Sequence, residues 1–129
     1  MAKKLISLFL FTLLFTLAAQ AQTVIFNVNL KPNLEDSMFV PDQDKIVIVG
    51  NFFPLGVNRS VQMFDEAPID SIYTAKIRFG SRYLGESLEY NFQIVDAEGN
   101  KNTESMVRKM TLQAGETESP PLYFNAFAW

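Results

Sequence analysis

The chain of 129 residues contains no cysteine and no histidine, and these two absences exclude much of enzyme chemistry. Without them there is no thiol nucleophile, no imidazole general base and no usual set of transition-metal ligands. The serines do not occur in a nucleophile-elbow pattern. Because no disulfide can form, the hydrophobic core alone must hold the fold together.

Carboxylate pairs, as in glycoside hydrolysis, are the catalytic chemistry that remains. All of them lie in or beside predicted turns, where acidic side chains are common because water and turn N–H groups solvate them. The pairs are Glu35/Asp36, Asp42/Asp44, Asp65/Glu66 and Glu98/Glu104. We therefore predict that the protein is not an enzyme and that it has no catalytic residues.

No stretch matches a metal-ligand or cofactor motif, so we predict no metal and no cofactor. Residues 96–100, DAEGN, superficially resemble a calcium loop but lack the glycine position and flanking helices of an EF-hand. A hairpin turn with Gly99 or Asn100 at positive φ is the interpretation that we prefer. Asp42 and Asp44 together form only a weak calcium signal.

Residues 1–21 have the features of a cleaved secretory signal peptide. Lys3 and Lys4 precede an apolar run, residues 5–17, and Ala19-Gln20-Ala21 supplies the small residues that signal peptidase requires. The run is short for a membrane span, although an uncleaved anchor is the alternative. We expect a secreted, periplasmic or cell-surface protein whose mature chain begins at Gln22.

The remaining residues, 22–129, suit one domain. Setting aside Lys3 and Lys4 lowers the formal charge from −3 to −5. An acidic surface argues against nucleic acid and anionic membrane as partners.

Strand patterns recur along the whole mature chain, and no window has a helical period. Residues 72–79 and 88–95 alternate apolar and polar side chains, and residues 45–49 are apolar on both faces. The predicted strands are residues 23–30, 45–49, 62–64, 72–79, 88–95, 107–112 and 122–127. They predict an all-β, immunoglobulin-like antiparallel sandwich, with long connections at 31–44 and 51–61 and an exposed bend at 114–121.

Aromatic residues in these connections are the candidates for binding. Phe52 and Phe53 are adjacent after Gly50-Asn51, so we expect one to point inward and the other toward solvent. Tyr83 lies in the turn at 80–85, and Phe39 lies in the long connection. Each could instead pack beneath its own loop as an extension of the core.

Several segments together resemble the starch-binding or glycogen-binding domains, a family of carbohydrate-binding modules. They cover nearly all of residues 23–127 and read TVIFNV, IVIVGNFFPLG, IYTAKIRF, SLEYNFQIVDAEGN and TES. The family loop runs G-N-F-x-x-L-G-x-W, its later strand reads Y-K-F, and a second Trp precedes Glu-Ser. The resemblance implies a non-catalytic module whose partner is a polysaccharide or oligosaccharide, with α-glucan as the family's ligand.

The framework positions of this family are kept, but its three main sugar-contacting positions differ. Asn58 stands at the first Trp, Asn91 at the Lys and Thr103 at the second Trp. The carbohydrate contacts predicted from the resemblance and from the aromatic loop are Phe53, Asn58, Tyr83, Asn91, Thr103 and Glu104. The alternative function is a structural or protein-interaction domain of the cell envelope, with an eroded sugar site and an envelope protein as its partner.

Overall fold

The computed structural model describes residues 22–56 and 58–127 of the chain. The predicted signal peptide, residues 1–21, and Trp129 lie outside the described residues. The elements are β1 (Gln22–Asn29), α2 (Lys31–Glu35), β2 (Lys45–Gly50), β3 (Val61–Gln62), β4 (Ile72–Phe79), the 3-10 turn η1 (Ser81–Tyr83), β5 (Ser87–Val95), β6 (Lys101–Thr103), β7 (Arg108–Thr111), β8 (Gly115–Glu118) and β9 (Leu122–Tyr123).

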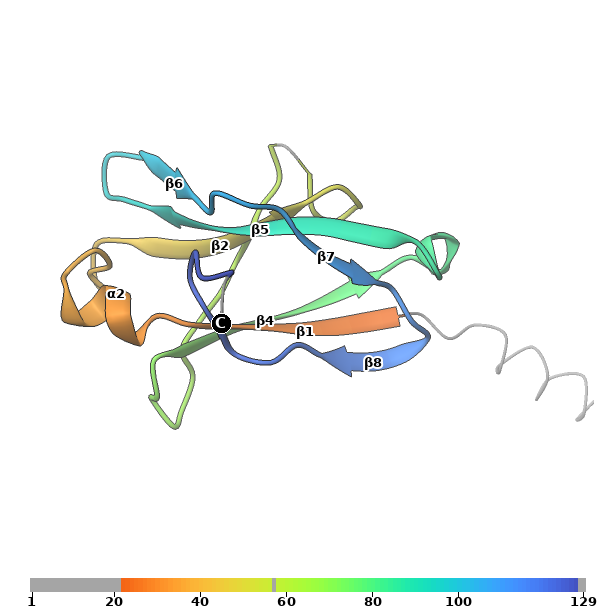
Figure 1. The fold of residues 1–129 in the computed structure, drawn as a ribbon, viewed down its shortest axis with the longest axis horizontal. Coiled ribbons are helices and arrows are strands. Elements are labelled where there is room, and N and C mark those ends of the chain that lie inside the picture. The colour runs from red at the N-terminus through yellow and green to blue at the C-terminus, as the bar shows by residue number, and fades with distance from the viewer. Residues whose placement is uncertain (1–21, 57, 128–129) are drawn as a thin grey trace, which may run out of the picture.

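The strands form two facing sheets, as Figure 1 shows. In one sheet, β1 lies between β4 and the pair of short strands β8 and β9; in the other, β5 lies between β2 and the pair β6 and β7, and β3 extends the β2 edge. All pairings are antiparallel except those of β1 with β8 and β9. The predicted immunoglobulin-like β-sandwich is therefore confirmed, with one mixed sheet.

Side chains at alternate positions of the long strands fill the space between the sheets. The alternation predicted for residues 72–79 and 88–95 is confirmed, because the core contains Ala75, Ile77 and Phe79 of β4 and Leu88, Tyr90, Phe92 and Ile94 of β5. Alternate residues of β1, namely Val24, Phe26 and Val28, are buried in the same way. β2 is buried on both faces at Ile46, Val47 and Ile48, as its continuous apolar run predicted. The largest fully buried side chains are Phe26, Phe79, Phe92, Leu30, Ile46 and Ile48.

Three sequence predictions about the elements were wrong. Residues 31–35 form the short helix α2, in which Pro32 is tolerated because the first helical turn needs no N–H at that position. The expected bend at 114–121 contains β8, which pairs with the edge of β1. The predicted last strand, 122–127, is reduced to Leu122–Tyr123, and β6 was not foreseen.

The turn at residues 96–100 is the predicted hairpin turn. Gly99 has φ +86°, and the Asp96 carboxylate accepts hydrogen bonds from the N–H groups of Glu98 and Asn100. Among the described residues, no helix has the length and apolar character that crossing a bilayer requires.

Candidate functional site

The outer face of β5 carries a row of polar side chains. Because Tyr90, Phe92 and Ile94 point into the core, the alternate residues Glu89, Asn91 and Gln93 face away from it. On the neighbouring strand, Val49 lies opposite Asn91 and Val47 opposite Gln93. On the other side, Thr103 of β6 lies opposite Gln93. The strand register thus places amides and valines side by side on one outer surface.

This surface forms a shallow groove of about 330 Å³, which we call the β5 groove. Its floor comes from β2 and β5, one wall from the loop after β2, and part of the rim from Val107. The lining residues are Val49, Gly50, Asn51, Gly56, Glu89, Tyr90, Asn91, Gln93 and Val107.

Each of the three amide side chains in the β5 groove is oriented by an internal hydrogen bond. Asn51 accepts from the backbone N–H of Glu89 at 2.9 Å. Asn91 donates to the carbonyl of Met106 at 2.6 Å, and Gln93 donates to the Thr103 hydroxyl at 2.9 Å. A primary amide has two donor and two acceptor positions, so one internal bond leaves capacity for a ligand.

The loop after β2 is anchored to the start of β5. Asn51 and Glu89 are joined both by the Asn51 side chain and by a backbone bond from the Asn51 N–H to the Glu89 carbonyl. A Cβ at Gly50 would lie 2.9 Å from Leu55 Cδ1 and 3.1 Å from the Glu89 carbonyl oxygen, so the close approach requires glycine. The wall of the groove is therefore fixed to its floor.

Phe52 and Phe53 diverge as predicted. Phe52 packs against the core, whereas Phe53 is 57% exposed. The Arg59 guanidinium lies 5.3 Å from the centre of the Phe53 ring. Asn58 is exposed in a turn that Gly56 and Arg59 close with two backbone hydrogen bonds.

Tyr83 is not part of the β5 groove. Its ring stacks on Phe52, with centroids 4.5 Å apart and planes at 13°, and the Arg82 guanidinium lies 4.8 Å from the same ring. Tyr83 thus packs against its own surroundings, which was the alternative for the loop aromatics. Phe39 behaves in the same way, since it is buried and meets Tyr73 edge to face.

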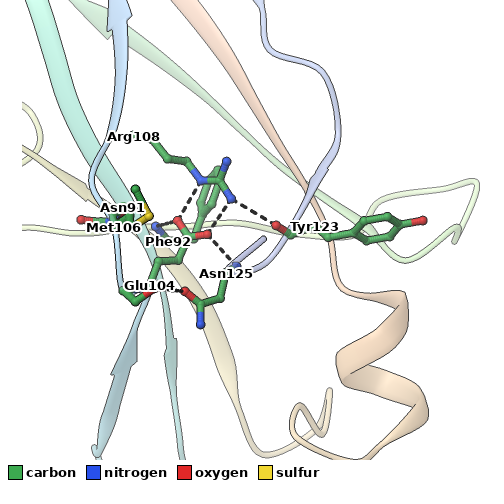
Figure 2. Close-up of polar contacts among 8 residues, drawn as sticks. Asn91, Phe92, Glu104, Met106, Arg108, Tyr123 and Asn125 are labelled. Carbon is green, nitrogen blue, oxygen red and sulfur yellow. Dashed lines mark hydrogen bonds and ion pairs between the residues drawn. The ribbon is translucent and has the colours of Figure 1, made fainter. Parts of the chain in front are cut away.

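Glu104 is buried, which corrects the expectation that it lies on a ligand-facing surface. Only 5% of the residue is exposed, and its carboxylate accepts two hydrogen bonds from Arg108, at 2.9 and 2.7 Å. It also accepts from the backbone N–H groups of Phe92 at 3.0 Å and Asn125 at 2.8 Å, as Figure 2 shows. With its lone pairs occupied inside the protein, Glu104 has no means of contacting a sugar, and we remove it from the candidate contacts.

Arg108 completes this buried cluster. Its guanidinium also donates to the Tyr123 carbonyl at 3.1 Å, as Figure 2 shows. The guanidinium lies over the rings of Phe92 and Phe127. The cluster therefore ties the centre of β5 to the C-terminal segment.

The Glu104 cluster also shapes one rim of the β5 groove. The partner strand of β5 is interrupted between β6 and β7, and the Glu104 carboxylate takes the Phe92 N–H at the gap. The intervening residues leave the sheet, which exposes the side chains of Met106 and Val107. Val107 lines the groove, and Met106 is held by Asn91.

The structure thus brings together only some of the predicted contacts. Asn91 and Thr103 share the outer surface of β5 and β6, and Phe53 and Asn58 lie in the loop that forms the wall. Tyr83 and Glu104 are elsewhere. The prediction missed Asn51, Gln93, Val49 and Val107; the alternation of residues 88–95 already placed Gln93 beside Asn91.

No arrangement for metal binding accompanies the groove. In the part of the chain that the structure describes, no three His, Cys, Asp or Glu side chains converge as metal ligands. Two carboxylates of the predicted pairs, Asp44 and Asp65, accept backbone hydrogen bonds in their own loops.

Comparison with known proteins supports the architecture. No family and no curated protein matches the sequence. Among solved structures, the gamma-CGTase of alkalophilic Bacillus clarkii has a TM-score of 0.60 at 21% identity, over 82% of this chain and 15% of that one. The glycoside hydrolase family 15 glucoamylase of Hypocrea jecorina has a TM-score of 0.57 at 14% identity, over 83% of this chain and 17% of that one. These likenesses show the fold, and this chain corresponds to a small part of either enzyme.

Proposed function

We propose that this protein is an exported, non-catalytic carbohydrate-binding module and that the β5 groove is its binding site. The observation that carries the proposal is the pairing of oriented amides with apolar side chains on one open surface. Asn51, Asn91 and Gln93 offer donors and acceptors for sugar hydroxyls. Val49 and Val107 offer apolar contacts for the C–H faces of a pyranose.

Two likenesses favour a glycan over other ligands. The sequence resembles starch-binding domains in its framework positions, and two of the similar structures are enzymes named as a gamma-CGTase and a glucoamylase. The first resemblance places family sugar contacts at Asn58, Asn91 and Thr103, which lie in or beside the β5 groove. An α-glucan is therefore the first ligand to test.

The groove lacks the tryptophans on which that family stacks its sugars. One stacked aromatic face buries roughly 80–100 Å², which at about 25 cal/mol/Å² is worth about 2 kcal/mol. Losing two such faces would weaken binding about a thousandfold. We therefore propose recognition dominated by hydrogen bonds, with the exposed ring of Phe53, in the loop beside the groove, as an additional contact.

A non-catalytic role fits the carboxylates. The carboxylates of the predicted pairs lie in α2 or in loops and turns, except for Glu104, whose carboxylate accepts hydrogen bonds from Arg108 and two backbone N–H groups. The proposal therefore assigns binding, not bond cleavage, to this domain.

The test is binding of the purified protein to a broad glycan array. Its retention is also measured by co-sedimentation with insoluble starch and by affinity electrophoresis in gels that contain glycogen. Wild type should be retained by at least one glycan, and Phe53→Ala and Gln93→Ala should each lose most of that retention. Lys76→Ala is the matched control, because Lys76 is an exposed residue of β4 on the opposite sheet. If no glycan on the panel retains wild type, or if the three variants behave alike, the proposal is wrong.

A further inference from the structure

A second groove, of about 450 Å³, lies at the other end of β2. It opens between the segment of residues 31–44, which includes α2, and the loop of residues 64–71. Figure 1 shows α2 at the end of the sandwich away from η1. Its apolar lining residues include Leu34, Phe39, Ile46, Phe64, Ile69 and Tyr73. We call this site the α2 groove.

Large apolar side chains at this groove are exposed to water. Ile69 is 76% exposed and Phe64 is 52% exposed. Covering such side chains is favourable, and clusters of them on a monomer typically mark interaction sites. The exposed side chains of Ile69 and Phe64 lie on the same groove, so an apolar side chain of a partner could cover both.

The walls of the α2 groove are held in place before any partner arrives. The Asp44 carboxylate accepts from the Val40 N–H at 2.8 Å, and the Asp65 carboxylate accepts from the Ser71 N–H at 2.9 Å. Residues 62–64 cross from one sheet to the other, since Gln62 pairs with β2 and Phe64 bridges to Thr74 of β4. A preformed groove loses less conformational entropy when it binds.

Negative charge surrounds this apolar surface. Residues 31–45 and 64–71 together carry seven acidic side chains and two lysines, of which Lys45 lines the groove beside Asp44 and Asp65. Among the described residues, the ion pairs are Lys76–Glu116, Arg108–Glu104 and Lys109–Glu89, so none neutralises these walls. Burial, and then the neighbouring charge of Asp65, raises the pKa of Tyr73, a residue that lines the groove.

From this combination we propose that the α2 groove docks a segment of another protein in which an apolar side chain is flanked by lysine or arginine. The apolar side chain covers Ile69 and Phe64, and the basic groups face the acidic walls. A second copy of this chain is a poor occupant, because its own acidic groove walls would meet like charge. The protein would then bind a glycan on one face and a protein at the end of the same sandwich.

Selection from a phage-displayed library of random peptides tests this proposal. Peptides enriched on the purified protein should combine an apolar residue with neighbouring Lys or Arg. Synthetic copies, measured by fluorescence anisotropy, should bind Ile69→Ser about tenfold more weakly than wild type. Binding should also weaken as ionic strength rises from 0.01 to 0.15 M, because the Debye length falls from roughly 30 to roughly 8 Å.

Leu84→Ser is the matched control, since Leu84 is also an exposed aliphatic residue but lines neither groove. It should leave peptide binding unchanged. The proposal is wrong if no peptide is enriched, if the enriched peptides carry no basic residues, or if their binding is indifferent to Ile69→Ser. Dimerisation of the protein alone that Ile69→Ser abolishes would also overturn it, because the occupant would then be a second copy.

Discussion

Two polar regions lie along β5, the cluster around Glu104 and the β5 groove, and they differ in whether their polar groups are buried or face solvent. In the Glu104 cluster, the carboxylate and guanidinium are buried and their hydrogen bonds are made within the protein. In the β5 groove, the amides of Asn51, Asn91 and Gln93 lie on the outer surface, and one hydrogen bond orients each of them. A polar residue near a candidate site is therefore a candidate for ligand binding only if it has a donor or an acceptor that no group of the protein occupies.

The contrast extends to energetics. A buried ion pair that is satisfied on all sides contributes little over an apolar pair, but removing one partner leaves an uncompensated buried charge. Exposed amides can be replaced at small cost, because water takes over their hydrogen bonds. Mutations in the two regions should thus separate stability from binding.

The largest effect is expected for Arg108→Met. It leaves the Glu104 carboxylate buried without its cation, so the free energy of unfolding should fall by about 3–5 kcal/mol. Urea denaturation, monitored by far-UV circular dichroism, measures the shift in the midpoint of unfolding.

Lys109→Met is the control for this variant. Lys109 is the next residue of β7 and pairs with Glu89 at 3.7 Å, but both side chains are at least half exposed. Its loss should change stability by less than about 1 kcal/mol. Equal effects of the two substitutions would remove the distinction between the two regions.

The second effect concerns affinity. Thr103→Trp and Asn58→Trp each restore an aromatic at a position where starch-binding domains carry one, beside the oriented amides of the β5 groove. Asn58→Trp should strengthen binding to α-glucan by about 2 kcal/mol, or about thirtyfold, with little change in stability because the residue is exposed. Thr103→Trp should give a smaller gain, because it also removes the hydroxyl that accepts the hydrogen bond from Gln93. Isothermal titration with a soluble malto-oligosaccharide measures the gain.

Lys76→Trp on the opposite sheet separates this gain from general adhesiveness. It places the same ring on an outer surface that has no such groove residues. If Lys76→Trp strengthens binding as much as Thr103→Trp does, the β5 groove has no special relation to the glucan.

The long strands were predictable because their signal is local. In residues 72–79 and 88–95, strict alternation with a period of two determines which side chains enter the core. β8 was not predictable in this way, since residues 115–118 are polar and form a strand only because the edge of β1 is available. The helix α2 has five residues, too few to display a helical period.

The candidate site was predictable only in part, for a related reason. The outward face of β5 follows from alternation, so Asn91 and Gln93 could be found from the sequence. The burial of Glu104 could not, because it depends on Arg108 across the interruption between β6 and β7 and on a backbone N–H from the C-terminal segment. Spacing alone does not reveal which carboxylate will meet its cation in the interior.

The smallest effect sharpens the comparison with a third carboxylate, that of Asp96. Like Glu104 it accepts several hydrogen bonds, but it lies in an exposed turn. The backbone N–H of Asn100, followed by the Asn100 side chain, lowers the pKa of Asp96 below its usual value. Because the folded pKa is depressed, Asp96 stabilises the protein above the pKa of the unfolded chain, roughly 3.9, and this contribution is lost as the pH falls through the lower folded pKa.

Titration of the Asp96 side-chain carboxyl carbon by NMR, with Asn100→Ala as the comparison, measures this shift. The pKa of Asp96 should rise toward its usual value in Asn100→Ala, because the side-chain hydrogen bond is lost while the backbone bond remains. Stability at pH 7 should change only slightly, because water solvates the exposed carboxylate of Asp96, whereas it cannot reach a buried carboxylate such as that of Glu104. A wild-type pKa at or above the usual value would contradict the hydrogen-bonding pattern of this turn.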